Sequence, residues 1–216
     1  MDHKTLTDRL SKAGLVPGPA ERLIPSDFNP TVQLEISFEG KPVQHGTSFR
    51  TSEVAVVPGV KFKPEAEADS RASYTLMLVG PDPAEPTNAD KAFFRHWLIP
   101  GLEPLASGMV AETKFALTPY RGPELEKDST PHSYLYLLYR EPRNQDPRKE
   151  DVGGDEFEER RAWKPEDYIK KHELKLVGLN WMTCAPEGGK TDNDGNNPDD
   201  VDTTEEPVVE PTVLAS

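Results

Sequence analysis

Proline recurs along almost the whole of this chain and limits the length of any helix. There are 22 prolines among 216 residues, and a proline inside a helix removes a backbone hydrogen bond and clashes with the preceding turn. We therefore expect strands and short helices. Hydrophobic residues make up 35% of the chain and the mean hydropathy is -0.68, so part of the chain is expected to lie outside a packed core.

The apolar runs between the prolines have the length and pattern of strands. Residues 32–38 alternate apolar and polar side chains, which is typical of a strand with one buried face. The run "SYTLMLV" (73–79) is apolar almost throughout, as expected of a central strand buried on both faces. Further strands are predicted at 95–102, 133–142 and 175–184, with a shorter piece at 53–62 that Pro58 and Gly59 interrupt.

Helical patterns lie near the two ends of this series of strands. Residues 5–14 place Leu6 and Leu10 on one face and end at Gly14, and two short helices are predicted at 156–163 and 165–174. This order indicates a mainly β fold rather than alternating strands and helices. We expect an N-terminal helical segment (1–22), one β domain (23–185) and a C-terminal tail (186–216).

Negative charge is concentrated in that tail. The net charge is -13, and residues 186–216 hold nine acidic residues, one basic residue and no aromatic residue. Such a segment cannot bury enough apolar surface to offset the entropy of ordering, so we predict a disordered, solubilising tail; a functional acidic tail is the alternative. An acidic surface repels phosphate, which excludes nucleic acid as an expected partner.

Several sequence features bear on location and chemistry. Cys184 is the only cysteine, so no disulfide can form within the chain. No secretory signal and no run of ~18 apolar residues is present, so we expect a soluble, cytoplasmic protein without a transmembrane segment. No paired ligands at metal-site spacing, no Gly-rich phosphate loop and no Gly-x-Ser-x-Gly motif is found, so neither a metal nor a cofactor is expected.

Two histidines stand at the start of predicted strands. His96 and His132 each follow a proline-containing loop, in "FFRHWLI" and "TPHSYLYLL". Either alone is typical of a hydrogen-bonded structural histidine. Together with Asp82, Tyr134 and the turn at Gly122 they form a candidate polar pocket, because imidazole, phenol and backbone N–H groups suit a phosphate or carboxylate.

The same residues carry a family resemblance. The chain resembles the phosphatidylethanolamine-binding protein family, and its intracellular fungal branch in particular, in the motifs "GPDPA" (80–84), "RHWLI" (95–99), "YRGPEL" (120–125) and "PHSYLYLLY" (131–139). The resemblance spans about residues 23–184. It implies a β-sandwich with a few flanking helices, and a shallow pocket for phosphate-type anions such as a phospholipid head group.

The resemblance also implies roles for individual residues. The pocket residues would be His96, His132 and Tyr134, with Asp82 as the second aspartate of the loop, Gly122 as a source of a backbone N–H and Phe94 as an apolar rim.

The chain departs from the family pattern at three of these motif positions. Gly80 stands where the family has an aspartate, Ala84 where it has a proline and Ser133 where it has an arginine. We expect Gly80 and Ser133 to lie in one neighbourhood of the pocket, so that an acid and a base are both missing there.

Three functions fit this interpretation. The first is a binding module for a small anionic ligand or phospholipid head group. The second is a serine carboxypeptidase inhibitor or a signalling regulator with a protein partner, because some relatives resemble proteins of these kinds. The third is an enzyme or accessory protein of fungal natural-product biosynthesis, of the maleidride type, in which histidines with near-neutral pKa (His96, His132) and Tyr134 act as base and acid. The sequence favours the binding module first, the enzyme or accessory protein second, and the inhibitor or regulator third.

Overall fold

The protein is described here from a computed structural model, which describes residues 3–69, 71–81, 93–143, 145–161 and 163–188. Along the chain its elements are α1 (His3–Lys12), β1 (Glu35–Phe38), β2 (Lys41–Val43), β3 (Thr47–Arg50), the 3-10 helix η1 (Ser52–Val54), β4 (Gly59–Lys61), β5 (Tyr74–Pro81), β6 (Phe93–Pro104), β7 (Val110–Glu112), β8 (His132–Arg140), the 3-10 helix η3 (Lys149–Asp151), α2 (Phe157–Arg161), α3 (Pro165–Lys171) and β9 (Lys175–Ala185).

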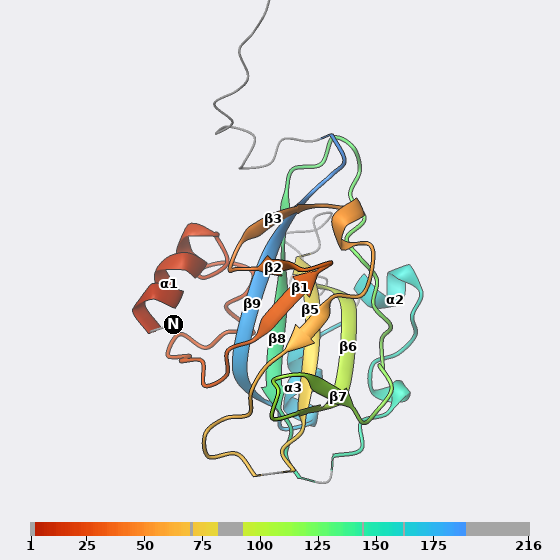
Figure 1. The fold of residues 1–216 in the computed structure, drawn as a ribbon. Coiled ribbons are helices and arrows are strands. Elements are labelled where there is room, and N and C mark those ends of the chain that lie inside the picture. The colour runs from red at the N-terminus through yellow and green to blue at the C-terminus, as the bar shows by residue number, and fades with distance from the viewer. Residues whose placement is uncertain (1–2, 70, 82–92, 144, 162, 189–216) are drawn as a thin grey trace, which may run out of the picture.

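The strands form two sheets (Figure 1). The smaller sheet has the order β2-β1-β4, and both pairings are antiparallel. The larger sheet has the order β3-β9-β8-β5-β6-β7, in which β3 runs parallel to β9 and the other neighbours are antiparallel. The predicted mainly β architecture with a few helices is confirmed.

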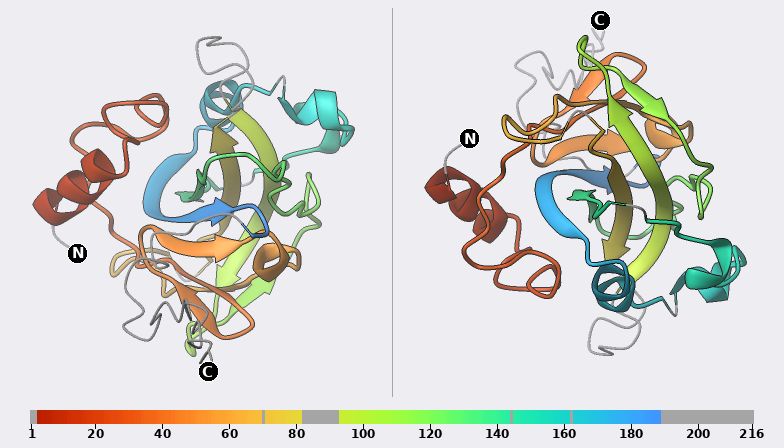
Figure 2. Two further views of the ribbon diagram at one scale, coloured as in Figure 1. Left: turned by 90° about the horizontal axis from the view of Figure 1, so that it is seen from above. Right: turned by 90° about the horizontal axis from the view of Figure 1, so that it is seen from below.

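Two apolar clusters cover the two faces of the larger sheet. On one face Leu76 and Leu78 of β5 pack with residues of the smaller sheet, such as Ile36. On the other face Met77 and Val79 pack with residues of α1 and of the segment around α3. Figure 2 shows the smaller sheet and α3 on opposite sides of the larger sheet. The double burial predicted for residues 73–79 therefore follows from the place of β5 between β8 and β6.

The segment 53–62 differs from its predicted strand. Its first residues form η1, and only Gly59–Lys61 pair as β4. Val56 and Val57 are 53% and 60% exposed, so their apolar character does not place them in a sheet. Proline at position 58 has no N–H to donate to a neighbouring strand, which explains why pairing begins only after it. The strands β3 and β7 escaped prediction because they are short and their sequences, "TSFR" and "VAE", show no clear alternation.

The first residues of the predicted tail are attached to the domain. Arg50 donates from Nη1 to the carbonyl of Pro186 at 3.2 Å, and Glu187 accepts from the hydroxyl of Thr51 at 3.1 Å and from the backbone N–H of Ser52 at 2.8 Å. The prediction of disorder concerns residues 186–216, and from residue 189 onward it lies outside the described residues.

These contacts move the expected boundary of the stable domain to the end of residue 188. We expect a chain cut after Gly188 to keep its melting temperature within about 2 °C. A chain cut after Cys184 should melt at least ~4 °C lower, because each lost hydrogen bond contributes on the order of 1 kcal/mol, or roughly 2–4 °C. Calorimetry of both truncations checks this, and an equal loss in both would mean that residues 189–216 stabilise the fold.

Candidate functional site

A β-bulge presents His96 at one end of the larger sheet. Leu78 pairs with Trp97 and Val79 pairs with Arg95, so His96 is an extra residue on β6 without a partner on β5. Bulges of this kind redirect a side chain and are frequent beside functional sites. His96 is 6% exposed.

Hydrogen bonds to Arg121 fix the orientation of the His96 ring. The Nδ1 atom of His96 lies 2.8 Å from the carbonyl oxygen of Arg121, and the backbone N–H of Arg121 donates to the carbonyl of His96 at 2.9 Å. A carbonyl oxygen can only accept, so Nδ1 carries the proton. The other ring nitrogen, Nε2, has no hydrogen-bond partner among the described residues.

Gly80 lets the rings of Tyr134 and His96 pack closely against β5. A Cβ atom on Gly80 would lie 2.8 Å from Cε1 of Tyr134, 2.9 Å from its Cδ1 and 3.1 Å from Nε2 of His96. The imidazole and phenol rings meet edge to face, with 5.1 Å between their centroids. Three strands thus bring together Gly80 from β5, His96 from β6 and Tyr134 from β8.

Phe94 and Phe157 form an apolar wall beside the imidazole. The ring of Phe94 lies 4.7 Å from that of His96 and 5.2 Å from that of Phe157, in α2. The guanidinium of Arg121 lies 5.5 Å from the centre of the Phe157 ring. Phe157 is 45% exposed, so this wall reaches the surface, while the role of Phe94 as an apolar rim of a ligand site stays a prediction.

His132 lies further along the same face of the sheet. It is the first residue of β8, is half-buried and pairs with Cys184 of β9. Because side chains alternate along a strand, His132 shares a face with Tyr134, about 7 Å away along the strand. The strand β5 separates β8 from β6. Among the described residues no contact joins His132 to His96, so a shared ligand remains a prediction.

The other two predicted residues have different outcomes. A Cβ atom on Gly122 would lie 2.6 Å from the carbonyl oxygen of Val54, and Tyr120 donates its hydroxyl to the same oxygen at 2.6 Å. Glycine at position 122 therefore lets this segment approach η1 closely, whereas its predicted role as a backbone donor to a ligand stays a prediction. Asp82 lies outside the described residues.

Buried arginines hold the backbone around His96. The Nη1 atom of Arg160, in α2, donates to the carbonyl of His96 at 3.3 Å and to that of Pro119 at 3.0 Å. Arg95 points to the other side of β6, where it donates to the carbonyls of Val152 and Gly154 at 2.5 Å each. These contacts tie the segment from η3 to α2 across β6, and so support the bulge.

Burial keeps the imidazole and phenol groups of the site neutral. Desolvation lowers the pKa of His96 to about 4, and it lowers the pKa of His132 as well. Desolvation also raises the pKa of Tyr134 well above its usual value. A pKa of about 4 makes His96 a poor match for the near-neutral base expected of an enzyme, because burial penalises the charged imidazolium. The charged side chains that act on the pKa of His96 are Arg160, Arg121 and Glu124.

A family model for "Phosphatidylethanolamine-binding protein" matches residues 27–181. The chain belongs to this family. Among curated relatives, it is similar to Protein FLOWERING LOCUS T of Arabidopsis thaliana, with 27% identity over 53% of this chain and 61% of that protein. It is also similar to CEN-like protein 1 of Nicotiana tabacum, with 29% identity over 53% of this chain and 62% of that protein. The chain thus spans about three fifths of these relatives.

Two solved structures share the fold. A carboxypeptidase Y inhibitor, solved in complex with its cognate proteinase, matches with a TM-score of 0.70 and 22% identity over 85% of this chain and 96% of that chain. The phosphatidylethanolamine-binding protein of Plasmodium vivax matches with a TM-score of 0.60 and 22% identity, over 83% and 97% of the two chains. At such identities the likeness establishes the fold.

The alternation of side chains bears on one expectation drawn from the family pattern. Gly80 and Ser133 lie on the neighbouring strands β5 and β8, but Ser133 precedes Tyr134, so its side chain projects to the opposite face. The neighbouring residue Leu135 belongs to the cluster on the helix side of the sheet, while Tyr134 belongs to the cluster between the sheets. An aspartate at position 80 and an arginine at position 133 would therefore lie on different sides of the sheet.

Three residues of the site were missed in the sequence. Arg121, Phe157 and Arg160 contact His96 or Phe94 from segments that lie 25 to 64 positions away in the chain. Arg121 lies inside the motif "YRGPEL", which was the one available signal. Nothing in "EFEERRAW" distinguishes Phe157 and Arg160 from the residues of an ordinary surface helix.

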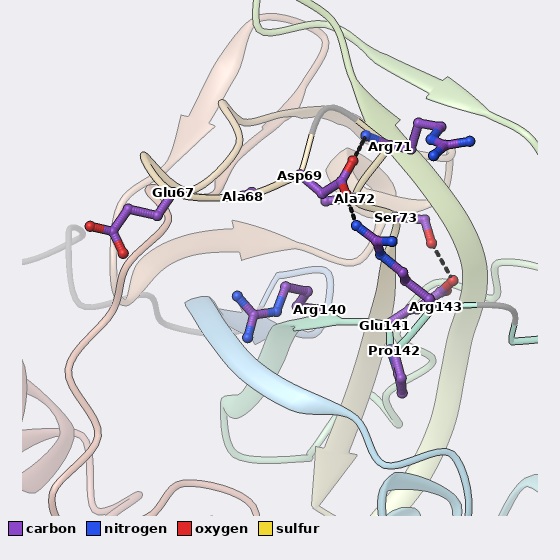
Figure 3. Close-up of a pocket in the computed structure, with 10 residues that line it drawn as sticks. All are labelled: Glu67, Ala68, Asp69, Arg71, Ala72, Ser73, Arg140, Glu141, Pro142 and Arg143. Carbon is purple, nitrogen blue, oxygen red and sulfur yellow. Dashed lines mark hydrogen bonds and ion pairs between the residues drawn. The ribbon is translucent and has the colours of Figure 1, made fainter.

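A separate hollow lies toward the opposite end of the larger sheet (Figure 3). It has a volume of about 490 Å³ and is lined by Glu67, Ala68, Asp69, Arg71, Ala72, Ser73, Arg140, Glu141, Pro142 and Arg143. Its charges compensate one another: Arg143 pairs with Asp69, and Arg140 pairs with Glu65 at 3.1 Å. The hollow therefore offers less net attraction to an anion than its three arginines suggest.

The described part of the chain holds neither a cluster of metal ligands nor a membrane-spanning helix. No group of three or more His, Cys, Asp or Glu side chains in it is arranged to hold a metal ion. None of the helices in this part is long and apolar enough to cross a bilayer.

Proposed function

We propose that the protein binds a small phosphate-bearing anion at the Nε2 atom of His96, beside Tyr134. The observation that carries the proposal is this Nε2 atom, which has no hydrogen-bond partner among the described residues, while Nδ1 is held by the carbonyl of Arg121. Phe94 and Phe157 would supply an apolar wall for the rest of the ligand. We further propose that His132, which shares the face of Tyr134, contacts the same ligand. We also propose the cytoplasmic location expected from the sequence.

The charge distribution around the site supports an anion. Arg121 and Arg160 both lower the pKa of His96 through their positive charge, so they would favour a negative ligand nearby. Arg121 is paired with Glu124 at 2.8 Å, and Arg160 lies 3.9 Å from Asp155. The attraction is therefore moderate, and hydrogen bonds would supply the selectivity.

Two other functions are ranked lower. The first is proteinase inhibition, which the structural likeness to a carboxypeptidase Y inhibitor favours; that likeness carries the fold alone. The second is catalysis in fungal natural-product biosynthesis. An imidazole with a pKa of about 4 is a weak base, and a phenol with a raised pKa is a weak acid, so both groups are poorly matched to proton transfer near neutral pH.

An NMR titration with inorganic phosphate tests the proposed function. Signals of His96, His132 and Tyr134 should move together with one dissociation constant. The variant His96→Gln should weaken binding at least tenfold, whereas His3→Gln, which alters an exposed contact with the carbonyl of Ser26, should leave it unchanged. Melting curves of both variants confirm that they fold. Equal binding by the two variants would remove the site from this position.

A further inference from the structure

We propose that His96 acts as a hydrogen-bond acceptor, so that the site selects phosphate compounds that carry a hydrogen-bond donor over those that carry none. This inference rests on the proposed function and adds the chemical class of its ligand. The donor is the P–OH of a phosphate monoester or the ammonium of a lipid head group.

The geometry of the imidazole carries the inference. The contact of 2.8 Å between Nδ1 and the carbonyl oxygen of Arg121 requires a proton on Nδ1. In a neutral imidazole the second nitrogen then holds a lone pair, so Nε2 accepts and cannot donate. Nε2 has no hydrogen-bond partner among the described residues, so it is the ring atom that remains for a ligand. A fully ionised phosphate oxygen beside Nε2 has no proton to donate, so two hydrogen-bond acceptors would face and repel each other.

The surroundings of His96 keep this state at neutral pH. The groups packed around the ring are Tyr134 from β8, Phe94 from β6, Phe157 and Arg160 from α2, and Arg121 and Glu124 from the segment after β7. Burial, with the charges of the two arginines, lowers the pKa to about 4, although the hydrogen bond to the carbonyl of Arg121 and the charge of Glu124 act in the opposite direction. A phosphate monoester loses its last proton with a pKa of roughly 6, so the shared proton stays on the ligand.

Tyr134 and the arginines complete a consistent set of partners. The raised pKa of Tyr134 keeps its hydroxyl protonated, so it can donate to a phosphate oxygen while Nε2 accepts. The site would then match an anion with one donor position and several acceptor oxygens, which is the pattern of a monoprotonated phosphate monoester. A phosphodiester lacks that donor unless its substituent supplies one.

The tautomer is tested first in the free full-length protein. Long-range proton–nitrogen NMR of ¹⁵N-histidine-labelled protein should show a protonated Nδ1 and an unprotonated Nε2 on His96 from pH 6 to pH 8. A proton on Nε2, in the other neutral tautomer or in an imidazolium, would overturn the inference. This measurement needs no ligand, so it is independent of whether the proposed function is right.

Three probes then test the selection: methyl phosphate, glycerophosphoethanolamine and dimethyl phosphate, which has no donor. Dimethyl phosphate should bind at least tenfold more weakly than the better of the other two. The dissociation constant of methyl phosphate should rise about tenfold per pH unit above roughly 6, as its monoanion disappears. That of glycerophosphoethanolamine should change little between pH 6 and pH 8. The tighter of these two identifies the source, a free monoester or a lipid head group, and Nε2 should remain unprotonated in the complex.

Other results would contradict the selection. Dimethyl phosphate binding as tightly as both other probes would show that no donor is needed, and tighter binding of methyl phosphate at pH 8 would show that the site prefers the dianion. An imidazolium in the complex would show that His96 donates. If none of the probes binds, both the anion-binding function and the selection are contradicted. If the probes bind without the expected preference, the selection alone is contradicted, and the tautomer measurement then shows whether the assigned state of His96 was the cause.

Discussion

Replacing Glu141 with glutamine is expected to lower the free energy of unfolding by about 3 kcal/mol. Glu141 is 8% exposed and its carboxylate accepts three hydrogen bonds: from the hydroxyl of Ser73 at 2.7 Å, from that of Thr75 at 2.6 Å and from the backbone N–H of Gly101 at 2.8 Å. These bonds join β5, β6 and the end of β8, and Figure 3 shows the one to Ser73. Hydrogen bonds to a charged group contribute roughly 1.5–3 kcal/mol each, and glutamine offers these three donors one neutral acceptor oxygen in place of a charged carboxylate.

Urea denaturation of Glu141→Gln measures this loss, and Glu158→Gln is the matched control. The side chain of Glu158 is 73% exposed and pairs with Arg161 at 3.6 Å, and exposed pairs of this kind contribute roughly 0–1 kcal/mol. Similar losses in the two variants would mean that the buried carboxylate has no special role in the end of the sheet.

Replacing Gly80 with alanine is expected to destabilise the fold by about 2 kcal/mol and to weaken phosphate binding at least tenfold. The added Cβ atom would lie 2.8 Å from the Tyr134 ring, and overpacking of this kind costs roughly 1–3 kcal/mol. Gly80 does not have a positive φ, so backbone strain adds nothing. The smaller entropy of the unfolded alanine chain offsets the loss by up to about 1 kcal/mol.

A double-mutant cycle identifies the cause of the loss. In the background of Tyr134→Ala the added methyl group has free space, so Gly80→Ala should then cost less than about 1 kcal/mol. A coupling of roughly 0.5–3 kcal/mol is normal for residues in contact. The same cost of Gly80→Ala in both backgrounds would show that Tyr134 does not limit this space.

Much of the fold could be predicted from local pattern, because strand burial leaves its mark on the residues of the strand itself. The run 73–79 is confirmed as a buried strand from Tyr74 onward, and the alternation at 32–38 is confirmed in its second half, where β1 buries Ile36 and Phe38. The acidic tail was identified from composition, although Glu187 is attached to η1. A contact of that kind joins residues far apart in the sequence, so composition gives no sign of it.

The candidate site was less predictable, because its properties depend on tertiary contacts. Sequence identified His96, Tyr134 and Phe94, which the structure brings together. It did not identify the bulge at His96, because an extra residue on one strand is defined only by the pairing with the next. The pKa of His96 was also beyond reach, since burial and the carbonyl of Arg121 set it.

The place of β9 in the larger sheet has a consequence for the order of folding. It is the last strand in the described part of the chain, yet it lies between β8 and β3, pairing with Thr47–Arg50 on one side and His132–Arg140 on the other. Until residues 175–185 have been synthesised, the edges of both neighbouring strands are unpaired and open to association with other chains. Pairings over such long separations are slow to form. During translation, the nascent protein therefore depends on its last strand for protection against aggregation.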